Sequence, residues 1–528
     1  MDRRQILALL AGLAPIPLTS AARAAGDGAR ELRLGVVTAP NSLDPHFYQS
    51  PTNNQTLKQI FDPLVVENLE GRIRPWLAET WRPIDDVTWE FKLRPGIRFH
   101  DGTPLEPEDV AFSIARIPAV PNSPGSFIPF VRNIADVIVV DRTTFRFRSK
   151  TPNPFLDRDF TSVLILSRKI HANAATADFT SGRYAIGTGA FRYAGFTVGQ
   201  QLDLVRNPDF WGAPTPWSRV RARFIADPGS RVAGLLAGDL DLIDAVPIQD
   251  VAHLAAGPGT AVFSAASATT AYLFPDSTRD QSPFVTDRQG APLPRNPFRD
   301  PRVRRALSLA INRAGIVNQL LAGQGIPADQ FAPPPAADRL PGRPPLPYDP
   351  AGAKRLLAEA GYPEGFGLTI HGPSGFFAGD SAVLQAIAQG LSRVGIETRV
   401  DTLPPATFFG RATNRDFSLF LTTYAATSSV DFLRQVVLTK DPDRGTGPFN
   451  RQLYSNPRLD ENGLAALTEM EPSRRLSLTH AALTELESDL GIVPVFYPRF
   501  NWAGRRSHVT FEPGNPFGHT NALFAKPV

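Results

Sequence analysis

The sequence contains no cysteine among its 528 residues. This absence excludes disulfide bridges, thiolate nucleophiles and zinc sites with cysteine ligands. Histidine is scarce as well, with eight copies, and no pair has the His-x-x-x-His spacing of helical metal sites. We therefore expect no metal and no cofactor. Without cysteine, disulfides cannot indicate the cellular compartment, so the compartment has to be inferred from the N-terminus.

Basic residues form no long run, because no stretch of consecutive lysine or arginine exceeds two residues. The sequence pI is about 9.3, but the 48 arginines and 7 lysines are scattered along the chain. Nucleic-acid-binding proteins instead gather their positive charge in a patch or stripe. Nucleic acid is therefore not an expected partner.

Proline is abundant, with 51 copies, so turns and long loops should be frequent. The stretch from Pro275 to Pro301 reads as a long surface loop. Residues 300–323 then predict a helix that ends at Gly323. A chain of this length should contain two to four domains of roughly 100–200 residues each.

The N-terminus has the three parts of an export signal. Arg3 and Arg4 precede an apolar run from Ile6 to Leu13, and Ala22-Arg23-Ala24 provides a cleavage site. The paired arginines indicate the twin-arginine route. The apolar run is too short to span a bilayer, and no cysteine is present for a lipid anchor. We expect residues 1–24 to be removed and the mature protein to lie in the periplasm.

Two segments resemble catalytic or nucleotide-binding motifs without meeting their spacing. In "HGPSGFF" (371–377), a nucleophile elbow would need glycines two residues before and two after the serine. Gly372 fits this rule, but Gly375 directly follows the serine. In "YAIGTGAFRYAGF" (184–196) the glycines lead into a strand, and the lysine of a phosphate-binding loop is missing. These mismatches favour a binding protein over an enzyme.

The stretch "FKLRPGIRFHDGTPLEPEDVAFSI" (91–114) places His100 beside Asp101, which could be half of a catalytic or metal site. Turn chemistry explains the same residues. Asp101-Gly102 is a preferred pair for a tight turn, because glycine accepts positive φ. We interpret His100 as the end of a short strand (97–100) and Asp101 as a turn residue.

A β-α-β pattern marks the best candidate site. Segments 368–372 and 396–403 read as strands on either side of a helix, and 416–424 reads as a third strand. This order implies a parallel pair with a right-handed crossover. Ligands of open α/β sheets bind beyond the carboxyl ends of the strands. The loop from Tyr424 to Asp431 is therefore the expected binding loop.

The segment "LAETWRPIDDVTWEFKLRPGIRFHDGTPLEPEDVAFSI" resembles the signature of the extracellular solute-binding protein family 5. This family contains peptide-, dipeptide- and nickel-binding proteins of ABC importers. "SLDP", "IGTGAFR", "NPDFWG", "DPRVRRALSLAINR" and "YDPAGAKRLLAEAGYPEGF" are similar to other family segments and stand in the same order. The resemblance implies an α/β fold of the periplasmic binding protein type II class. Two lobes would close by a hinge over a central cleft, beside an extra strand-rich domain.

This resemblance divides the mature chain into three parts. Lobe I is expected to combine residues 30–60, 183–272 and 490–528. The strand-rich accessory domain is expected to span residues 61–182, and lobe II residues 273–489.

The resemblance also identifies a departure at the binding loop. Dipeptide binders carry a Trp-x-x-Asp-like motif whose aspartate holds the peptide amine. Here "YAATSSVD" has Tyr424 and Thr427 at those two positions, with Asp431 one helical turn later. We expect Tyr424 to stack on the solute and Thr427, Ser428 and Asp431 to provide polar contacts. Simple dipeptides should bind poorly, because a buried amine without its carboxylate is costly.

Structural alternatives exist for part of this site. Ser429 could cap a helix that begins near Phe432, with Asp431 favouring its positive end. The turn "NSLDP" contains three further candidate contacts, although it could be purely structural. These candidates are Asn41, Ser42 and Asp44.

The expected function is that of a receptor for an ABC importer. It would capture a peptide or similar small solute by lobe closure and deliver it to a membrane permease and its ATPase, acting as a monomer. Opines, sugars, metal chelates and antibiotics are alternative cargoes for such a scaffold. An exported hydrolase of peptides or glycosides and a periplasmic chaperone on the same fold are the alternative functions.

Overall fold

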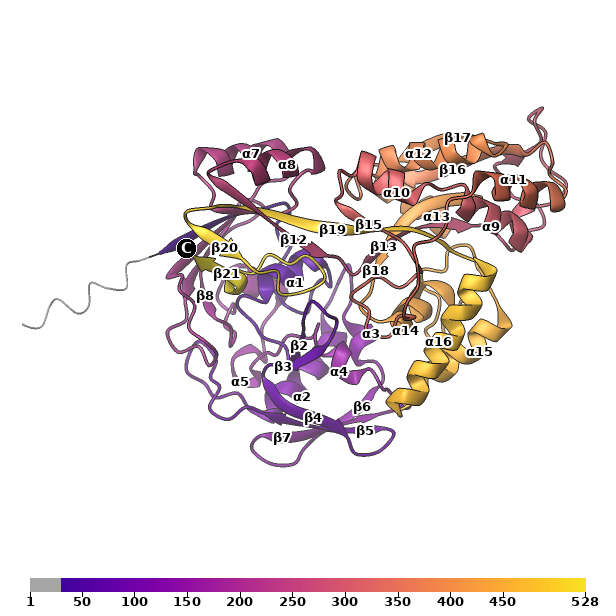
Figure 1. Cartoon of the computed structure of the whole chain (residues 1–528). Helices are drawn as coiled ribbons and strands as arrows, with labels where there is room; N and C mark the ends of the chain where they lie inside the picture. The colour runs from indigo at the N-terminus through magenta and orange to yellow at the C-terminus, as the bar shows by residue number, and fades with distance from the viewer. Residues whose placement is uncertain (1–29) are drawn as a thin grey trace, which may run out of the picture.

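The structure, a computed structural model, describes residues 30–528. The expected export signal, residues 1–24, lies outside these residues. The described chain forms lobe I at the left of Figure 1, lobe II at the right, and an accessory domain at the bottom. No helix within residues 30–528 is long and apolar enough to cross a membrane.

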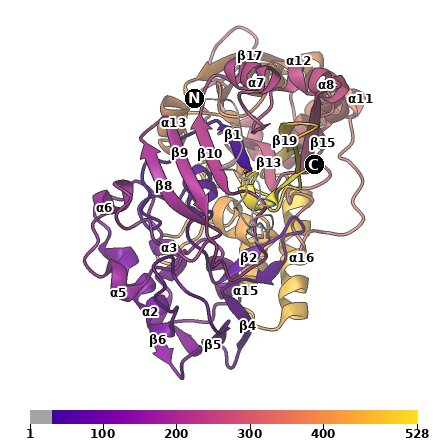
Figure 2. The same ribbon diagram turned by 90° about the vertical axis from the view of Figure 1, so that its left-hand side faces the viewer.

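One large sheet passes through both lobes, and its lobe I part contains parallel and antiparallel pairs. β1 runs parallel to β10 and β11, whereas β10, β9 and β8 pair antiparallel and form the broad face seen in Figure 2. The lobe I strands are β1 (Glu31–Val36), β8 (Phe191–Thr197), β9 (Gln201–Arg206), β10 (Arg219–Phe224), β11 (Leu242–Ile243) and β12 (Thr260–Ala266). The helices are α1 (Pro51–Leu57), α7 (Pro228–Ala237) and α8 (Ile248–Ala256). The C-terminal hairpin pairs β20 (Val509–Phe511) with β21 (Ala525–Pro527) around a 3-10 turn at Ala522–Phe524.

The lobe II part of the sheet contains the predicted β-α-β unit. β16 runs parallel to β17, with Phe366 opposite Ile396, and also parallel to β18. The lobe II strands are β13 (Thr269–Pro275), β14 (Val285–Thr286), β15 (Gly325–Pro327), β16 (Phe366–Pro373), β17 (Ile396–Leu403) and β18 (Leu419–Ala425). Helix α12 (Asp380–Arg393) connects β16 to β17, so the predicted parallel pair is confirmed.

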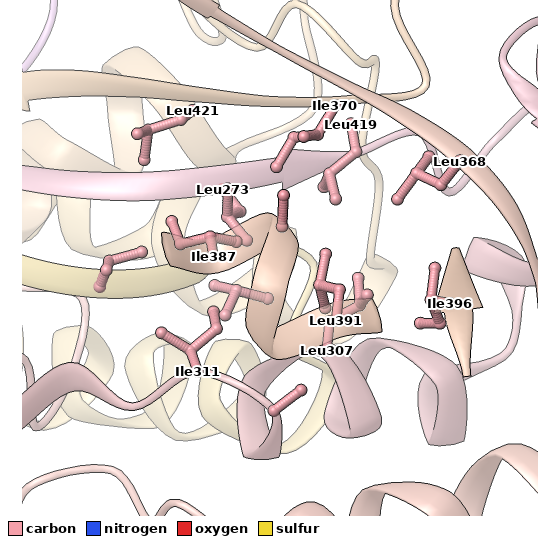
Figure 3. Close-up of a cluster of buried hydrophobic side chains, with 14 of the residues drawn as sticks. Leu273, Leu307, Ile311, Leu368, Ile370, Ile387, Leu391, Ile396, Leu419 and Leu421 are labelled. Carbon is pink, nitrogen blue, oxygen red and sulfur yellow. The ribbon is translucent and has the colours of Figure 1, made fainter. Parts of the chain in front are cut away.

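Helices cover the lobe II sheet and bury a large apolar core. Helix α12 buries Val383, Leu384 and Ile387 at helical spacing. Figure 3 shows Ile387 and Leu391 of α12 close to leucine and isoleucine side chains of the neighbouring strands. The other helices are α9 (Pro301–Leu309), α10 (Arg313–Gly315), α11 (Pro350–Glu359), α13 (Pro405–Thr413), α14 (Ser429–Phe432), α15 (Pro457–Thr468) and α16 (Pro472–Asp489).

Two segments carry the chain between the lobes. The first passes from β12 in lobe I to β13 in lobe II through residues 267–268. The second is β19 (Val493–Arg505), whose first residues pair with β13 and whose later residues pair with β12 and β11. The first crossing lies a few residues before the boundary expected at 272–273, and the second lies within β19, after the boundary expected at 489–490. Both boundaries stay predictions.

The accessory domain is a four-stranded antiparallel sheet packed on short helices. Its core is aromatic, with Phe147 stacked on Phe160 at 4.3 Å and on edge to Phe91 at 5.3 Å. The sheet contains β4 (Ala78–Pro83), β5 (Thr88–Leu93), β6 (Ile134–Val139) and β7 (Thr144–Ser149), and a hairpin pairs β2 (Val65–Glu67) with β3 (Ile73–Pro75). The helices are α2 (Pro107–Arg116), α3 (Ile128–Val131), α4 (Leu156–Asp159), α5 (Arg168–His171) and α6 (Thr176–Thr180).

The helix predicted over 300–323 is broken, which corrects the sequence interpretation. α9 ends at Leu309, and the Asn312 side chain accepts a hydrogen bond from the Gly315 amide at 2.8 Å to begin a new turn. Arg313 is buried and donates to the carbonyl of Pro494 at 2.9 Å. This tertiary contact and the local cap replace the continuous helical path.

The turn at His100 has the predicted geometry in its central part. Gly102 has φ +90°, and Asp101 accepts hydrogen bonds from the Thr103 amide and hydroxyl at 2.9 and 2.8 Å. The strand expected at 97–100 is wrong, because only an isolated bridge at Arg98 forms there. Asp101 is thus a turn residue.

Candidate functional site

Two adjoining cavities lie between the lobes, with volumes of about 560 and 400 Å³. Tyr424, Phe449 and Phe517 line both cavities, together with Glu67 and Thr161. Because they share these walls, we treat the two cavities as one interlobe cleft with a larger and a smaller part. Its size is in the range of pockets that hold small molecules.

Tyr424 occupies the centre of the cleft because it lies near the carboxyl end of β18. Its ring contacts Phe432 edge-on at 5.2 Å and Phe449 at 5.4 Å. Burial, followed by the charge of Asp431, raises the pKa of Tyr424 well above its ordinary value. The phenol therefore stays neutral and presents an aromatic face with a polar tip to the cleft.

Arg158 connects the accessory domain to the binding loop of lobe II. Its guanidinium forms an ion pair with Glu67 and donates to Thr427 Oγ1 at 2.7 Å and to the carbonyl of Gly71 at 3.1 Å. The Thr427 side chain is buried, so its hydroxyl faces a cation at the wall of the smaller cavity.

Asp431 also lines the smaller cavity, on the side of Arg434. Arg434 donates to Asp431 at 3.0 Å. Asp159 lies on the same cavity wall, and its pKa is raised to about 7, chiefly by burial and against the lowering effect of Arg434. Asn153 donates to Asp159 at 3.2 Å. Asp431 is therefore already paired, and Asp159 is the carboxyl group that this wall offers to a ligand cation.

Ser428 lies next to the cleft without lining either of its parts. Its hydroxyl donates to Asp338 at 2.9 Å, on an adjoining cavity of about 280 Å³ that shares Arg158 and Thr427 with the smaller part of the cleft. Asp338 also accepts hydrogen bonds from the backbone amides of Ser429 and Val430 at 2.6 and 3.3 Å. Helix α14 begins at Ser429, so the idea that Ser429 caps a helix near Phe432 is wrong, and Asp338 of another loop caps it.

The turn "NSLDP" lies outside the lining of the cleft. Asp44 is fully buried and accepts two hydrogen bonds from Arg116 at 2.8 and 2.7 Å. Burial acts to raise the pKa of Asp44, but the hydrogen bonds and charge of Arg116 outweigh it and lower the pKa. The Ser42 hydroxyl accepts from the Asp44 amide at 3.0 Å, and Asn41 accepts from Asn53 at 2.8 Å. These contacts stabilise the turn.

His100 has a structural position as well. Its Nδ1 accepts a hydrogen bond from the Gly187 amide at 3.2 Å, so Nε2 carries the proton and donates to the Gly189 carbonyl at 3.0 Å. Burial lowers the pKa of His100 to about 4. A neutral imidazole thus joins the accessory domain to the glycine loop of lobe I. His100 is also absent from the lining of the cleft.

Sequence reasoning missed most of the cleft. Lys58, Glu67, Arg158 and Phe449 line it from three distant parts of the chain. No local sequence pattern around these four residues marks a binding site. Within residues 30–528, no group of three or more potential metal ligands comes together.

Two lobes joined by two crossing segments, with a mixed polar and aromatic cleft between them, define a binding protein of the two-lobed class. Residues 72–440 match the family described as "Bacterial extracellular solute-binding proteins, family 5 Middle". The chain therefore belongs to this family, as its motifs predicted, and is a substrate-binding receptor of an ABC importer.

Individual relatives agree with this assignment. The chain is 27% identical over 471 residues to the glutathione-binding protein GsiB of Escherichia coli (strain K12), covering 86% of each chain. The murein tripeptide binding protein MppA, in its unliganded open form, matches with a TM-score of 0.77 at 22% identity, covering 95% of this chain and 98% of that chain. AgaA of A. tumefaciens R10, in complex with agropinic acid, matches with a TM-score of 0.71 at 23% identity, covering 94% and 99%. These two structures share the expected type II fold.

Proposed function

We propose that this receptor captures a short peptide or peptide-like solute in the interlobe cleft and releases it unchanged to the permease. The observation that carries the proposal is the composition of the cleft. Aromatic faces of Tyr424, Phe449 and Phe517 stand between charged groups, as a solute with an apolar body and ionic ends requires. The glutathione-binding name of the GsiB relatives supports a peptide-like cargo.

Closure of the lobes would follow from contacts made by both lobes at once. Lobe II contributes Tyr424 and Thr427, and lobe I contributes Lys58 and Phe517. A solute that touches both sides binds the closed form more tightly and shifts the population toward it. We propose that the permease then recognises the closed receptor as a monomer in the periplasm.

The position of Thr427 argues against an amine anchored at that residue. A solute ammonium there would lie beside the guanidinium of Arg158, which donates to the same hydroxyl at 2.7 Å. Like charges at this separation repel each other in a cleft screened from water. We therefore propose that a solute amine lies closer to Asp159, and that simple dipeptides bind weakly.

Isothermal titration of glutathione, trialanine and dialanine into the wild type, Tyr424→Ala and Tyr424→Phe would test the proposal. The wild type should bind glutathione or trialanine, and Tyr424→Ala should weaken that binding about tenfold or more because the central aromatic face is lost. Tyr424→Phe keeps the ring and should bind nearly as well. Absence of binding by the wild type, or equal binding by Tyr424→Ala, would contradict the proposal.

Catalysis is tested on the same samples. Mass spectrometry should recover the titrated peptide with its mass unchanged after prolonged incubation. Cleaved or modified peptide would contradict a receptor that only binds, and would restore the exported hydrolase as the function.

A further inference from the structure

The amino group of Lys58 has no partner in the described part of the chain. Lys58 directly follows helix α1 and lines the larger cavity of the cleft. No described side chain or carbonyl forms a hydrogen bond or ion pair with its Nζ. An exposed lysine needs no protein partner because water solvates its ammonium group, although Lys92 pairs with Glu79 at 2.9 Å and Lys526 with Glu512 at 3.0 Å. An unpaired ammonium in a cavity is therefore the exception to explain.

The end of helix α1 does not explain this lysine. A cation at a helix C-terminus is favourable, and the charge of Glu67 also favours the ammonium. Burial nevertheless outweighs both effects and lowers the pKa of Lys58 to about 8. The environment without a solute thus opposes the charge that Lys58 carries at neutral pH.

Neighbouring charged groups are already engaged or neutral. Glu67 is paired with Arg158. Burial, aided by the charge of Lys58, lowers the pKa of His519 to about 3, so this ring is neutral. Of the described residues lining the larger cavity, Lys58 is the one cation.

The remaining carboxyl group of this cavity is also saturated. Asp62 accepts hydrogen bonds from Trp76 at 2.7 Å, Thr188 at 2.7 Å and Trp211 at 3.2 Å. The Asp62 carboxyl group is thus already hydrogen-bonded by three donors, and it forms no ion pair with Lys58.

Asn54 provides an independent observation at the same wall. It lines the larger cavity, is 6% exposed, and its buried Oδ1 has no hydrogen-bond partner among the described residues. A buried carbonyl oxygen without a donor is costly. Asn54 stands one helical turn before Lys58, so both side chains project from the same face of α1.

We propose that Lys58 and Asn54 form an anion subsite for the solute. Lys58 would pair with a carboxylate, and Asn54 would accept a hydrogen bond from an N–H group beside it, as at the C-terminus of a peptide. This assignment rests on the proposed function and adds a substrate class to it, namely peptide-like acids with a free carboxylate in the larger cavity. Amines would lie at the opposite, acidic part of the cleft.

The test compares glutathione and trialanine with their C-terminal amides by calorimetry. The wild type should bind at least one acid about 10- to 100-fold more tightly than its amide, the usual strength of a hydrogen bond to a charged group. Lys58→Met should bind the acid no better than the amide. Lys169→Met, which removes an exposed lysine, is the matched control and should behave as the wild type.

The outcomes separate this inference from the proposed function. Equal binding of acid and amide by the wild type, unchanged in Lys58→Met, would overturn the anion subsite and leave the peptide receptor intact. Failure to bind either peptide in either form would contradict the proposed function. In that case the Lys58 subsite is decided by acetate alone, with no peptide present.

The acetate measurement follows the lysine Cε resonances of protein labelled with ¹³C-lysine during a pH titration. The Lys58 resonance is assigned as the one missing from Lys58→Met. Excess acetate should raise the pKa of Lys58 from about 8, because a bound anion favours the charged amine. A pKa that acetate leaves unchanged would overturn the subsite.

Discussion

Replacing His100 with alanine should destabilise the protein and leave its affinity for solute unchanged. The imidazole accepts from the Gly187 amide at 3.2 Å and donates to the Gly189 carbonyl at 3.0 Å. Alanine leaves the Gly187 amide without a partner, and a buried unpaired group costs about 1–3 kcal/mol. The Gly189 carbonyl keeps a hydrogen bond from Asn207 at 3.1 Å. We therefore expect the free energy of unfolding to fall by about 1–3 kcal/mol. Affinity should change less than about twofold, because His100 does not line the cleft.

The effect of His100 should depend on pH in a defined direction. Its pKa is lowered to about 4 in the folded protein, against about 6.5 in an unfolded chain. The unfolded chain therefore binds the proton first as pH falls, and the stabilisation by neutral His100 is complete above pH 6.5 and lost toward pH 4. The loss is on the order of 3 kcal/mol. His100→Gln can form both hydrogen bonds without titrating, so its stability should exceed that of the wild type in acid.

Urea unfolding followed by tryptophan fluorescence at pH 7.5 and pH 5 measures these differences, and calorimetry with glutathione or trialanine measures affinity. His253→Ala removes an exposed histidine and should change neither quantity. A large loss of affinity in His100→Ala, with the free energy of unfolding intact, would refute the structural interpretation of His100.

Gly102→Val should lower the free energy of unfolding by about 1–2 kcal/mol. No atom lies within 4 Å of an added Cβ, so the cost comes from the backbone, whose φ of +90° is unfavourable for valine. Equal stability of the two proteins in urea would contradict this. Thr427→Asp should not create tight dipeptide binding, because the new carboxylate would pair with Arg158 beside it. Calorimetry measures this, and tight dipeptide binding by the wild type would refute the prediction that this chain differs from dipeptide binders. Changing Arg3 and Arg4 to lysine should retain the precursor in the cytoplasm, as immunoblots of cell fractions would show; normal periplasmic yield would instead indicate the general secretory route.

The fold could be predicted from the sequence where local pattern and tertiary structure agree. The strand, helix and strand of 366–403 follow their own hydrophobic periods, and the structure pairs them in parallel as expected. The helix of 300–323 could not be predicted in the same way. Its apolar spacing continues past Leu309, whereas the chain breaks because Arg313 is held by the distant carbonyl of Pro494.

The lining of the cleft could be predicted from the sequence only at the carboxyl end of β18. Tyr424 and Thr427 were located from the position of β18 in the sequence, and both line the cleft. Asp44 has the same residue type as a binding carboxylate, but its ion pair with Arg116 is a contact 72 positions away. Lys58 faces the cleft through the packing of α1 against a C-terminal loop, which no local pattern reveals.

The central claim, that this receptor holds a small solute unchanged between its lobes, is tested most directly by native mass spectrometry of the protein isolated from its own periplasm. The account predicts one bound small molecule per monomer that carries a carboxylate, keeps its mass when released by unfolding, and is depleted from Tyr424→Ala. A wild type and Tyr424→Ala with identical spectra would contradict the central claim, whereas a solute without any acidic group would contradict the anion subsite alone.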